Sequence, residues 1–224
     1  MTTDLLHWDR RRFLGVAASG LAVAALAGCG LGPSSTPDPA DGADGAKGWG
    51  GEVVDPGLVK PDVTFTDMHG NPFPFREKTD GKLAMLFFGY TNCPDVCPTT
   101  LNALARAIEK IGDGPGSAPM VLFVGVDIAR DTPKQLTEYL GRINHTFLGL
   151  TGSEHVIATA NKQVFNPPIE IGQPDANGEY LVGHSSRVLV YTKDNLAHRI
   201  YDGDAVRQQE WVKDLPRLDE GTFK

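Results

Sequence analysis

The chain has 224 residues, a formal net charge of -7, six histidines and three cysteines. An acidic chain without a basic stripe is poorly suited to a phosphate backbone, so nucleic-acid binding is disfavoured. A glycine-rich phosphate loop, a Gly-x-Ser-x-Gly motif and internal repeats are all missing from the sequence. The enzyme classes that those motifs mark are therefore also disfavoured.

The N-terminus has the features of an export signal. Residues 9–14, Asp-Arg-Arg-Arg-Phe-Leu, fit a twin-arginine signal, and the apolar run 13–27 is too short and too weakly apolar for a membrane span. Residues 26–29, Leu-Ala-Gly-Cys, resemble the lipobox of bacterial lipoproteins, although a plain signal peptide with a chance cysteine is the alternative. We expect residues 1–28 to be removed and Cys29 to be lipidated, which anchors the chain to the extracytoplasmic face of a bacterial cell membrane.

The next segment predicts a tether followed by one domain. Residues 29–59 are rich in Gly, Pro, Ala, Ser and Asp and show no apolar periodicity, which is typical of a flexible linker. A coil of this length spans roughly 30 Å root-mean-square. Residues 60–224 have the length of one ordinary domain with its own core.

The first predicted elements surround a strand-to-helix turn. Two short β-rich segments, 63–67 and 72–75, predict a hairpin, and the apolar run Leu83–Phe88 predicts a buried strand. Apolar residues then recur at helical spacing, with Pro98 suited to the first helical position and Gly112 suited to the stop. We therefore expect a helix over Pro98–Ile111.

Strands and helices alternate over the following residues. Met120–Val126 predicts a second, parallel strand, and a helix over Pro133–Ile143 begins after the capping residue Thr132. A short strand over Phe147–Leu150 precedes a helix over Ser153–Phe165, with Ser153 as its cap. This alternation is typical of α/β proteins.

The C-terminal part predicts a hairpin and a closing helix. A Gly- and Pro-rich loop over Asn166–Glu179 precedes the strands Val188–Tyr191 and Ala197–Tyr201, and a helix runs from Asp204 to near Pro216. The predicted fold class is α/β, namely a thioredoxin-like sandwich with an N-terminal β-hairpin and a central mixed sheet flanked by helices. Chemistry in such a sandwich is expected at the first strand-to-helix turn.

Cys93 and Cys97 lie at that turn. The free N–H groups and the dipole of a helix start favour a thiolate, which is the form that attacks disulfides and binds metals. A structural disulfide or two inert buried thiols are the alternatives. If Cys29 is lipidated, Cys93 and Cys97 are the two free cysteines that remain in the chain. Two neighbouring thiols outside the cytoplasm tend to form a disulfide, so a function that needs thiolates also needs an external reductant.

Two thiolates are soft donors that suit Cu(I) and accept Zn(II), but a stable site needs a third ligand. His184 is the leading candidate because it follows the polar loop and precedes a strand. Weaker candidates fall in the signal, a turn, a loop, a helix start and a hairpin strand: His7, His69, His145, His155 and His198.

Three segments resemble the Sco/SenC family in content and order. They are Gly-Tyr-Thr-Asn-Cys-Pro-Asp-Val-Cys-Pro at 89–98, Val-Asp-Ile-Ala-Arg-Asp-Thr-Pro at 126–133, and Gly-His-Ser at 183–185. The resemblance implies a thioredoxin fold that binds copper through Cys93, Cys97 and His184, as Cu(I) and, with an added ligand, as Cu(II). It also implies delivery to the copper-bearing subunit of cytochrome c oxidase, which has a dinuclear copper centre, after loading by an upstream copper donor.

Some residues near these motifs leave alternatives open. Many family members carry an acidic residue where this chain has Gly183, so a carboxylate next to the histidine is not expected here. Asp95 could tune the cysteine loop or be a solvated turn residue. Asp127, Arg130 and Asp131 fall near the first strand-to-helix turn, where structural ion pairs are favoured over a partner-facing patch.

Two functions compete for this sequence. The leading hypothesis is a membrane-tethered copper metallochaperone, which is a binding protein rather than an enzyme. The alternative is an extracytoplasmic thiol–disulfide reductase that acts on cysteines of the oxidase or of another cuproprotein, uses Cys93 and Cys97, and does not need the histidine. A peroxiredoxin-like peroxidase is disfavoured because the usual Thr-x-x-Cys context is missing.

Overall fold

The structure is a computed structural model that describes residues 48–223. The predicted export signal, the lipidation of Cys29 and most of the predicted tether lie outside the described residues. Within the described part of the chain, no helix combines the length and apolar character needed to cross a bilayer.

An eight-stranded mixed sheet forms the centre of the domain. In spatial order its strands are β1 (Glu52–Val59), β10 (Leu196–Asp202), β9 (Arg187–Tyr191), β4 (Ala84–Gly89), β5 (Met120–Gly125), β6 (Leu148–Thr151), β2 (Thr64–Asp67) and β3 (Pro72–Pro74). The neighbours β4, β5 and β6 run parallel, and the other pairs are antiparallel. The predicted hairpins β2–β3 and β9–β10 are confirmed.

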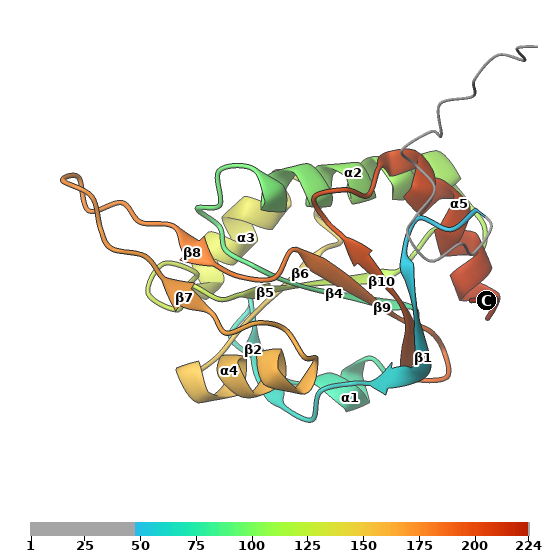
Figure 1. The fold of residues 1–224 in the computed structure, drawn as a ribbon, viewed down its shortest axis with the longest axis horizontal. Coiled ribbons are helices and arrows are strands. Elements are labelled where there is room, and N and C mark those ends of the chain that lie inside the picture. The colour runs from blue at the N-terminus through green and yellow to red at the C-terminus, as the bar shows by residue number, and fades with distance from the viewer. Residues whose placement is uncertain (1–47, 224) are drawn as a thin grey trace, which may run out of the picture. The chain divides into compact units, whose positions relative to one another are not determined.

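Helices cover both faces of the sheet. They are α1 (Phe75–Lys78), α2 (Val96–Ile111), α3 (Pro133–Gly141), α4 (Glu154–Gln163) and α5 (Gln208–Asp219). Figure 1 shows α2, α3 and α5 on one side of the sheet and α1 and α4 on the other. The predicted fold class, a mixed sheet flanked by helices, is therefore confirmed.

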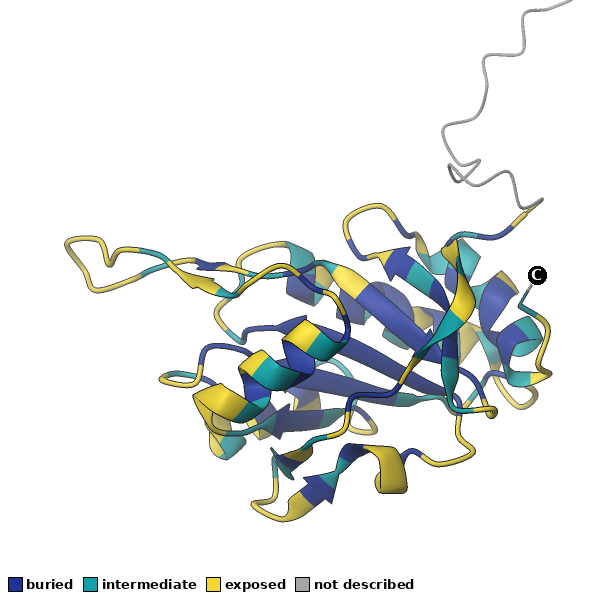
Figure 2. Ribbon diagram, turned by 60° about the horizontal axis from the view of Figure 1, so that its bottom comes forward, coloured by how far each residue is buried: buried dark blue, intermediate teal, exposed yellow. Residues whose placement is uncertain are grey.

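The alternation of β4 explains why two hydrophobic cores exist. Met85 and Phe87 belong to the core under α2, α3 and α5, whereas Leu86 and Phe88 belong to the core on the opposite face. Successive strand residues point to opposite faces, so a strand that is apolar at every position is buried on both. Figure 2 shows this central strand region in the buried colour. The start of α2 is thereby fixed to a rigid base.

The folded domain begins earlier than predicted. The sequence placed its start near Lys60, but β1 pairs with β10 and Trp49 is only 4% exposed. The indole lies between the guanidinium groups of Arg199 and Arg217, 4.4 and 3.5 Å from its ring. The strand was missed because Pro and Gly interrupt its pattern and its partner strand lies far along the chain. Residues 49–59 are thus part of the domain rather than of the tether.

Other differences are local. The helix α2 starts at Val96, so Cys97 is its second residue, and α5 continues through Pro216 to Asp219. The predicted loop after α4 contains a further strand, β7 (Glu170–Ile171), which pairs with β8 (Val182–Gly183). The predicted caps Thr132 and Ser153 both accept a backbone hydrogen bond from the first turn of their helices, which confirms them.

Candidate metal centre

The two cysteines lie where β4 passes into α2. The backbone N–H of Cys93 donates to the carbonyl of Tyr90 at 3.1 Å, which closes a tight turn after the strand. Cys97 is fully buried in the core under α2, while Cys93 is half-buried, and both are free thiols. The backbone N–H of Cys97 points at the Cys93 sulfur at 3.5 Å. The helix start therefore presents a donor to Cys93, whereas the sequence placed Cys97 at the helix start.

Gly89 lets the buried sulfur approach the end of β4. A Cβ at this position would lie 2.7 Å from the Sγ of Cys97 and 2.6 Å from the ring of Phe123. Both distances are far below van der Waals contact, so a side chain here would displace one of them. The position of the Cys97 sulfur thus requires a glycine at position 89, eight residues earlier in the chain.

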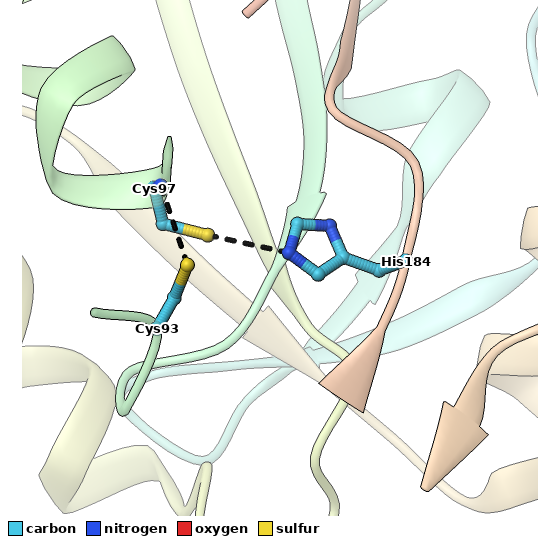
Figure 3. Close-up of side chains that lie close together, drawn as sticks. All are labelled: Cys93, Cys97 and His184. Atoms are coloured by element: carbon cyan, nitrogen blue, oxygen red, sulfur yellow. Dashed lines mark hydrogen bonds between the residues drawn. The ribbon is translucent and has the colours of Figure 1, made fainter. Parts of the chain in front are cut away.

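His184 completes the group from a different part of the chain. It directly follows β8, and its Nε2 lies 3.7 Å from the Sγ of Cys97. The two sulfurs and one imidazole nitrogen all lie within 4.8 Å of one another. Figure 3 shows the Cys97 sulfur pointing at the imidazole ring and the Cys93 sulfur pointing toward Cys97. The structure therefore brings together the three residues that the sequence singled out.

Hydrogen bonding and ring contacts fix the orientation of His184. Its Nδ1 donates to the carbonyl of Ser185 at 2.8 Å, because a carbonyl can only accept, and this leaves Nε2 as the nitrogen that faces the sulfurs. The rings of Tyr90 and Phe87 contact the imidazole edge-on, with centroids 5.5 and 6.4 Å away. The Ser185 carbonyl occupies the role that a carboxylate before the histidine could have had.

The other described histidines lie elsewhere. His69, His145 and His155 are exposed on the surface. His198 is buried, stacks on Phe223 and pairs through its Nε2 with a carboxylate 2.7 Å away. Within residues 48–223, His184 is the histidine that joins the two cysteines.

The pKa values of the two thiols are shifted in opposite directions. The hydrogen bond from Cys97 lowers the pKa of Cys93 to about 3, and His184 and the backbone N–H groups of Asp95 and Cys97 act in the same direction against partial burial. The pKa of Cys97 is raised, first because the Cys93 sulfur holds its proton and second because it is buried. Near neutral pH the pair is therefore one thiolate and one thiol.

The imidazole responds to the same thiolate. Burial pulls the pKa of His184 down, but the hydrogen bond to Cys93 and the Ser185 carbonyl pull it up, and the net shift is upward. The neighbouring negative charge is what favours the protonated ring.

A turn after β5 contacts the loop that carries the cysteines. Asp131 is fully buried and accepts hydrogen bonds from the backbone N–H and the hydroxyl of Thr91, at 2.9 and 2.7 Å. It also accepts from the backbone N–H of Asp127 at 3.0 Å. Burial raises the pKa of Asp131, while these hydrogen bonds oppose that shift. The turn is thereby tied to a residue two positions before Cys93.

The same turn contacts the segment before His184. Arg130 forms an ion pair with Asp127, and its Nη2 donates to the carbonyl of Tyr180 at 2.9 Å. The Tyr180 hydroxyl donates to Asp127 at 3.0 Å, and the guanidinium lies 3.6 Å from the centre of the Tyr180 ring. The prediction of a structural ion pair is confirmed. Asp95, by contrast, is exposed, and its carboxylate accepts a hydrogen bond from the Thr99 hydroxyl at 3.4 Å.

The donor set fits a soft monovalent ion. Two sulfurs and one neutral imidazole nitrogen, clustered at one point, are the ligands that Cu(I) prefers. A closed structural zinc site uses four ligands, and the cluster in the described residues has three. Cys93, Cys97 and His184 can therefore hold copper without rearranging the fold.

The sheet order, the flanking helices and a thiol pair at the first strand-to-helix turn define a thioredoxin-like protein with an added histidine. The SCO1/SenC family matches residues 54–219, most of the chain. The chain therefore belongs to the SCO1/SenC family.

Individual relatives agree with this assignment. The mitochondrial protein SCO2 of Saccharomyces cerevisiae is 37% identical over 123 residues, which cover 54% of this chain and 40% of that protein. The match thus spans less than half the length of that relative. Apo Sco1 of Thermus thermophilus is 33% identical, with a TM-score of 0.65 over 76% of this chain and 96% of that one. Copper-bound ScoI of Arabidopsis thaliana is 26% identical, with a TM-score of 0.66 over 73% and 99% of the two chains.

Several residues of the site were missed in the sequence. Tyr90 and Phe87 pack against the histidine, and Tyr180 joins the ion pair of the turn after β5. An aromatic residue in a strand or loop predicts core packing equally well, so its pattern did not mark these positions. Gly89 was quoted within a motif, but its close approach to Cys97 requires the folded strand end.

Proposed function

We propose that this protein binds Cu(I) through Cys93, Cys97 and His184 and delivers it to a client protein. The observation that carries the proposal is the convergence of two sulfurs and one imidazole nitrogen within 4.8 Å. The copper-bound Arabidopsis relative supports the choice of metal. Cu(I) is favoured over Cu(II) because two of the three donors are soft sulfurs and Cu(II) would need an added ligand.

The exposure of the site suits transfer rather than permanent storage. Cys93 is half-buried, and His184 lines a hollow of about 720 Å³ together with Ser185, Arg187 and Asp202. A client thiolate would reach the ion beside the half-buried Cys93, bind it, and displace one sulfur at a time. Such ligand exchange needs a coordination number below the maximum, which three ligands provide.

The client and the location follow from the family and from the N-terminal sequence. We propose that the client is the copper-bearing subunit of cytochrome c oxidase, as the resemblance implies, and that an upstream donor supplies the copper. The signal and the lipobox around Cys29 support a lipid anchor on the extracytoplasmic face of a bacterial membrane. A thiol reductant is needed there, because a vicinal pair outside the cytoplasm tends to oxidise.

A thiol–disulfide reductase is the second candidate, and the unequal acidity of the thiols favours it. The Cys93 thiolate would attack a client disulfide, forming a mixed disulfide and releasing one client thiolate. Cys97 would then lose its proton and displace the second client sulfur, so that the client gains two electrons and Cys93–Cys97 becomes the disulfide. An external dithiol would return the pair to its reduced form.

The test is an anaerobic competition titration of the reduced protein with Cu(I). We expect one tightly bound equivalent in the parent protein, strong weakening in His184→Ala, and no change in His155→Ala, which removes an exposed histidine. Binding that is weak or indifferent to His184 would sink the three-ligand proposal. Disulfide exchange with a model client, measured on the same variants, would then establish whether the reductase function stands alone.

A further inference from the structure

We propose that the turn 127–131 is a bridge that sets the distance between the two halves of the metal centre, with Arg130 and Asp131 as its positioning residues. The inference rests on the proposed metal-binding function but concerns residues that are not ligands. In this proposal Arg130 positions the segment that carries the histidine, and Asp131 positions the loop that carries the cysteines.

The histidine needs such support because its own backbone contacts are few. His184 lies on a long excursion between α4 and β9, in which the only strand pairing is the two-residue ladder of β7 and β8 within the described residues. Figure 1 shows the tip of this excursion extending beyond the rest of the fold. Two-residue ladders are weak by themselves, so side chains must add to the positioning of this segment.

Arg130 contributes a set of side-chain contacts to this segment. Its guanidinium stacks on the ring of Tyr180 and donates to the Tyr180 carbonyl, four residues before His184. It also reaches Glu179 at 3.4 Å. Asp127 closes the triangle, because its carboxylate binds both the guanidinium and the Tyr180 hydroxyl. A planar guanidinium that stacks and donates at once fixes orientation more strictly than a lysine could.

Asp131 supplies the contact to the cysteine loop. Its two carboxylate oxygens have different partners, since Oδ1 accepts hydrogen bonds from Thr91 and Oδ2 accepts one from the backbone N–H of Asp127. Gly125 makes this approach possible, because a Cβ there would lie 2.6 Å from the Cβ of Asp131. One turn of five residues thereby holds the cysteine side and the histidine side in a single frame.

The experiment compares Arg130→Met with Arg106→Met, which removes an exposed arginine of α2. Hydrogen exchange of the metal-free protein is measured first, because it does not depend on copper. We expect faster exchange in residues 179–186 of Arg130→Met while α2 and β4 keep their protection. A uniform loss of protection, or none, would overturn the proposal.

Cu(I) affinity of the same two variants is the second measurement. We expect Arg130→Met to weaken Cu(I) binding by up to about 10-fold, the lower end of the range found when a direct hydrogen-bond partner of a metal ligand is removed, because Arg130 acts on His184 only through Tyr180. The imidazole nitrogen hyperfine signal of the Cu(II)-loaded protein should weaken as well. Arg106→Met should change neither. If Arg130→Met binds like the parent while His184→Ala does not, this inference fails and the metal site stands. If His184→Ala also binds like the parent, the proposed function fails.

A buried carboxylate without its partner could unfold Arg130→Met, so a second pair of variants keeps the test decisive. Tyr180→Leu removes the stacking surface and the hydroxyl but leaves the Asp127–Arg130 ion pair intact. Tyr180→Phe restores the ring alone. We expect Tyr180→Leu to reproduce the local change in exchange and Tyr180→Phe to rescue most of it. Equal behaviour of Tyr180→Leu and the parent would refute the bridge.

Discussion

The cysteine side and the histidine side of the metal centre are held in different ways. Cys97 lies in the core between the sheet and α2, so close packing on all sides and the β4–β5 ladder fix its sulfur. His184 lies on a long excursion that is held by a two-residue ladder, the ring contacts of Tyr90 and Phe87, and the side chains of the turn after β5. The position of the cysteines is therefore fixed by the core of the fold, whereas the position of His184 depends on a few local contacts.

The largest expected effect comes from removing the fixed half. Cys97→Ala should lower Cu(I) affinity by several orders of magnitude, because it removes one of the two soft sulfur donors. His184→Ala should cost less, since both sulfurs remain. Competitive titration of the two variants measures the difference. An equal loss in both would contradict the distinction between the two halves.

A large effect on stability is also expected at Gly89, where β4 approaches the Cys97 sulfur. Gly89→Ala should destabilise the protein by about 1–3 kcal/mol, because its Cβ would overlap the Cys97 sulfur and the Phe123 ring. Gly141→Ala is the matched control, since a Cβ at that position meets nothing within 4 Å. Urea denaturation of both variants measures the free energy of unfolding. Equal stability would show that β4 can relax away from Cys97.

The thiols themselves should react unequally. With its pKa lowered to about 3, Cys93 should be alkylated by iodoacetamide at a rate that is nearly constant from about pH 5 upward, because it is already a thiolate there. Cys97 should stay unmodified because it is buried and its pKa is raised. Mass spectrometry of peptides gives both rates. A Cys93 rate that climbs tenfold per pH unit up to pH 8 would contradict the assigned thiolate.

The smallest expected effect lies at the start of the histidine excursion. Phe165 follows α4 with φ 56° and is 76% exposed, and this left-handed conformation costs an aromatic residue more than a glycine. Phe165→Gly should therefore stabilise the protein by up to about 1 kcal/mol, whereas Phe165→Ala should not. Thermal unfolding compares the two. Stabilisation by Ala alone would point to the exposed ring rather than the backbone as the cause.

The sequence predicted the cysteine side better than the histidine side for the same physical reason. The strand β4, the helix α2 and the cysteines between them are contiguous, so apolar period and helix-start signals were enough to place Cys93 and Cys97. His184 was chosen from several histidines partly through family resemblance, because its contact with Cys97 joins segments 87 residues apart. The contribution of β1 to the sheet edge and the role of Tyr180 depend equally on distant pairing. Local patterns carry no information about such contacts.

The shared proton of the cysteine pair has a consequence for the charge of the domain. With Cys93 as thiolate and Cys97 as thiol, the cysteine pair of the empty centre carries one negative charge. A monovalent ion bound by both sulfurs would expel the proton of Cys97, and two thiolates with one cation again sum to one negative charge. At the two sulfurs, loading is then an exchange of one cation for another. Any change in the charge of the centre on loading must therefore come from His184, because its pKa is raised despite burial and its Nε2 must be free of a proton to bind a metal.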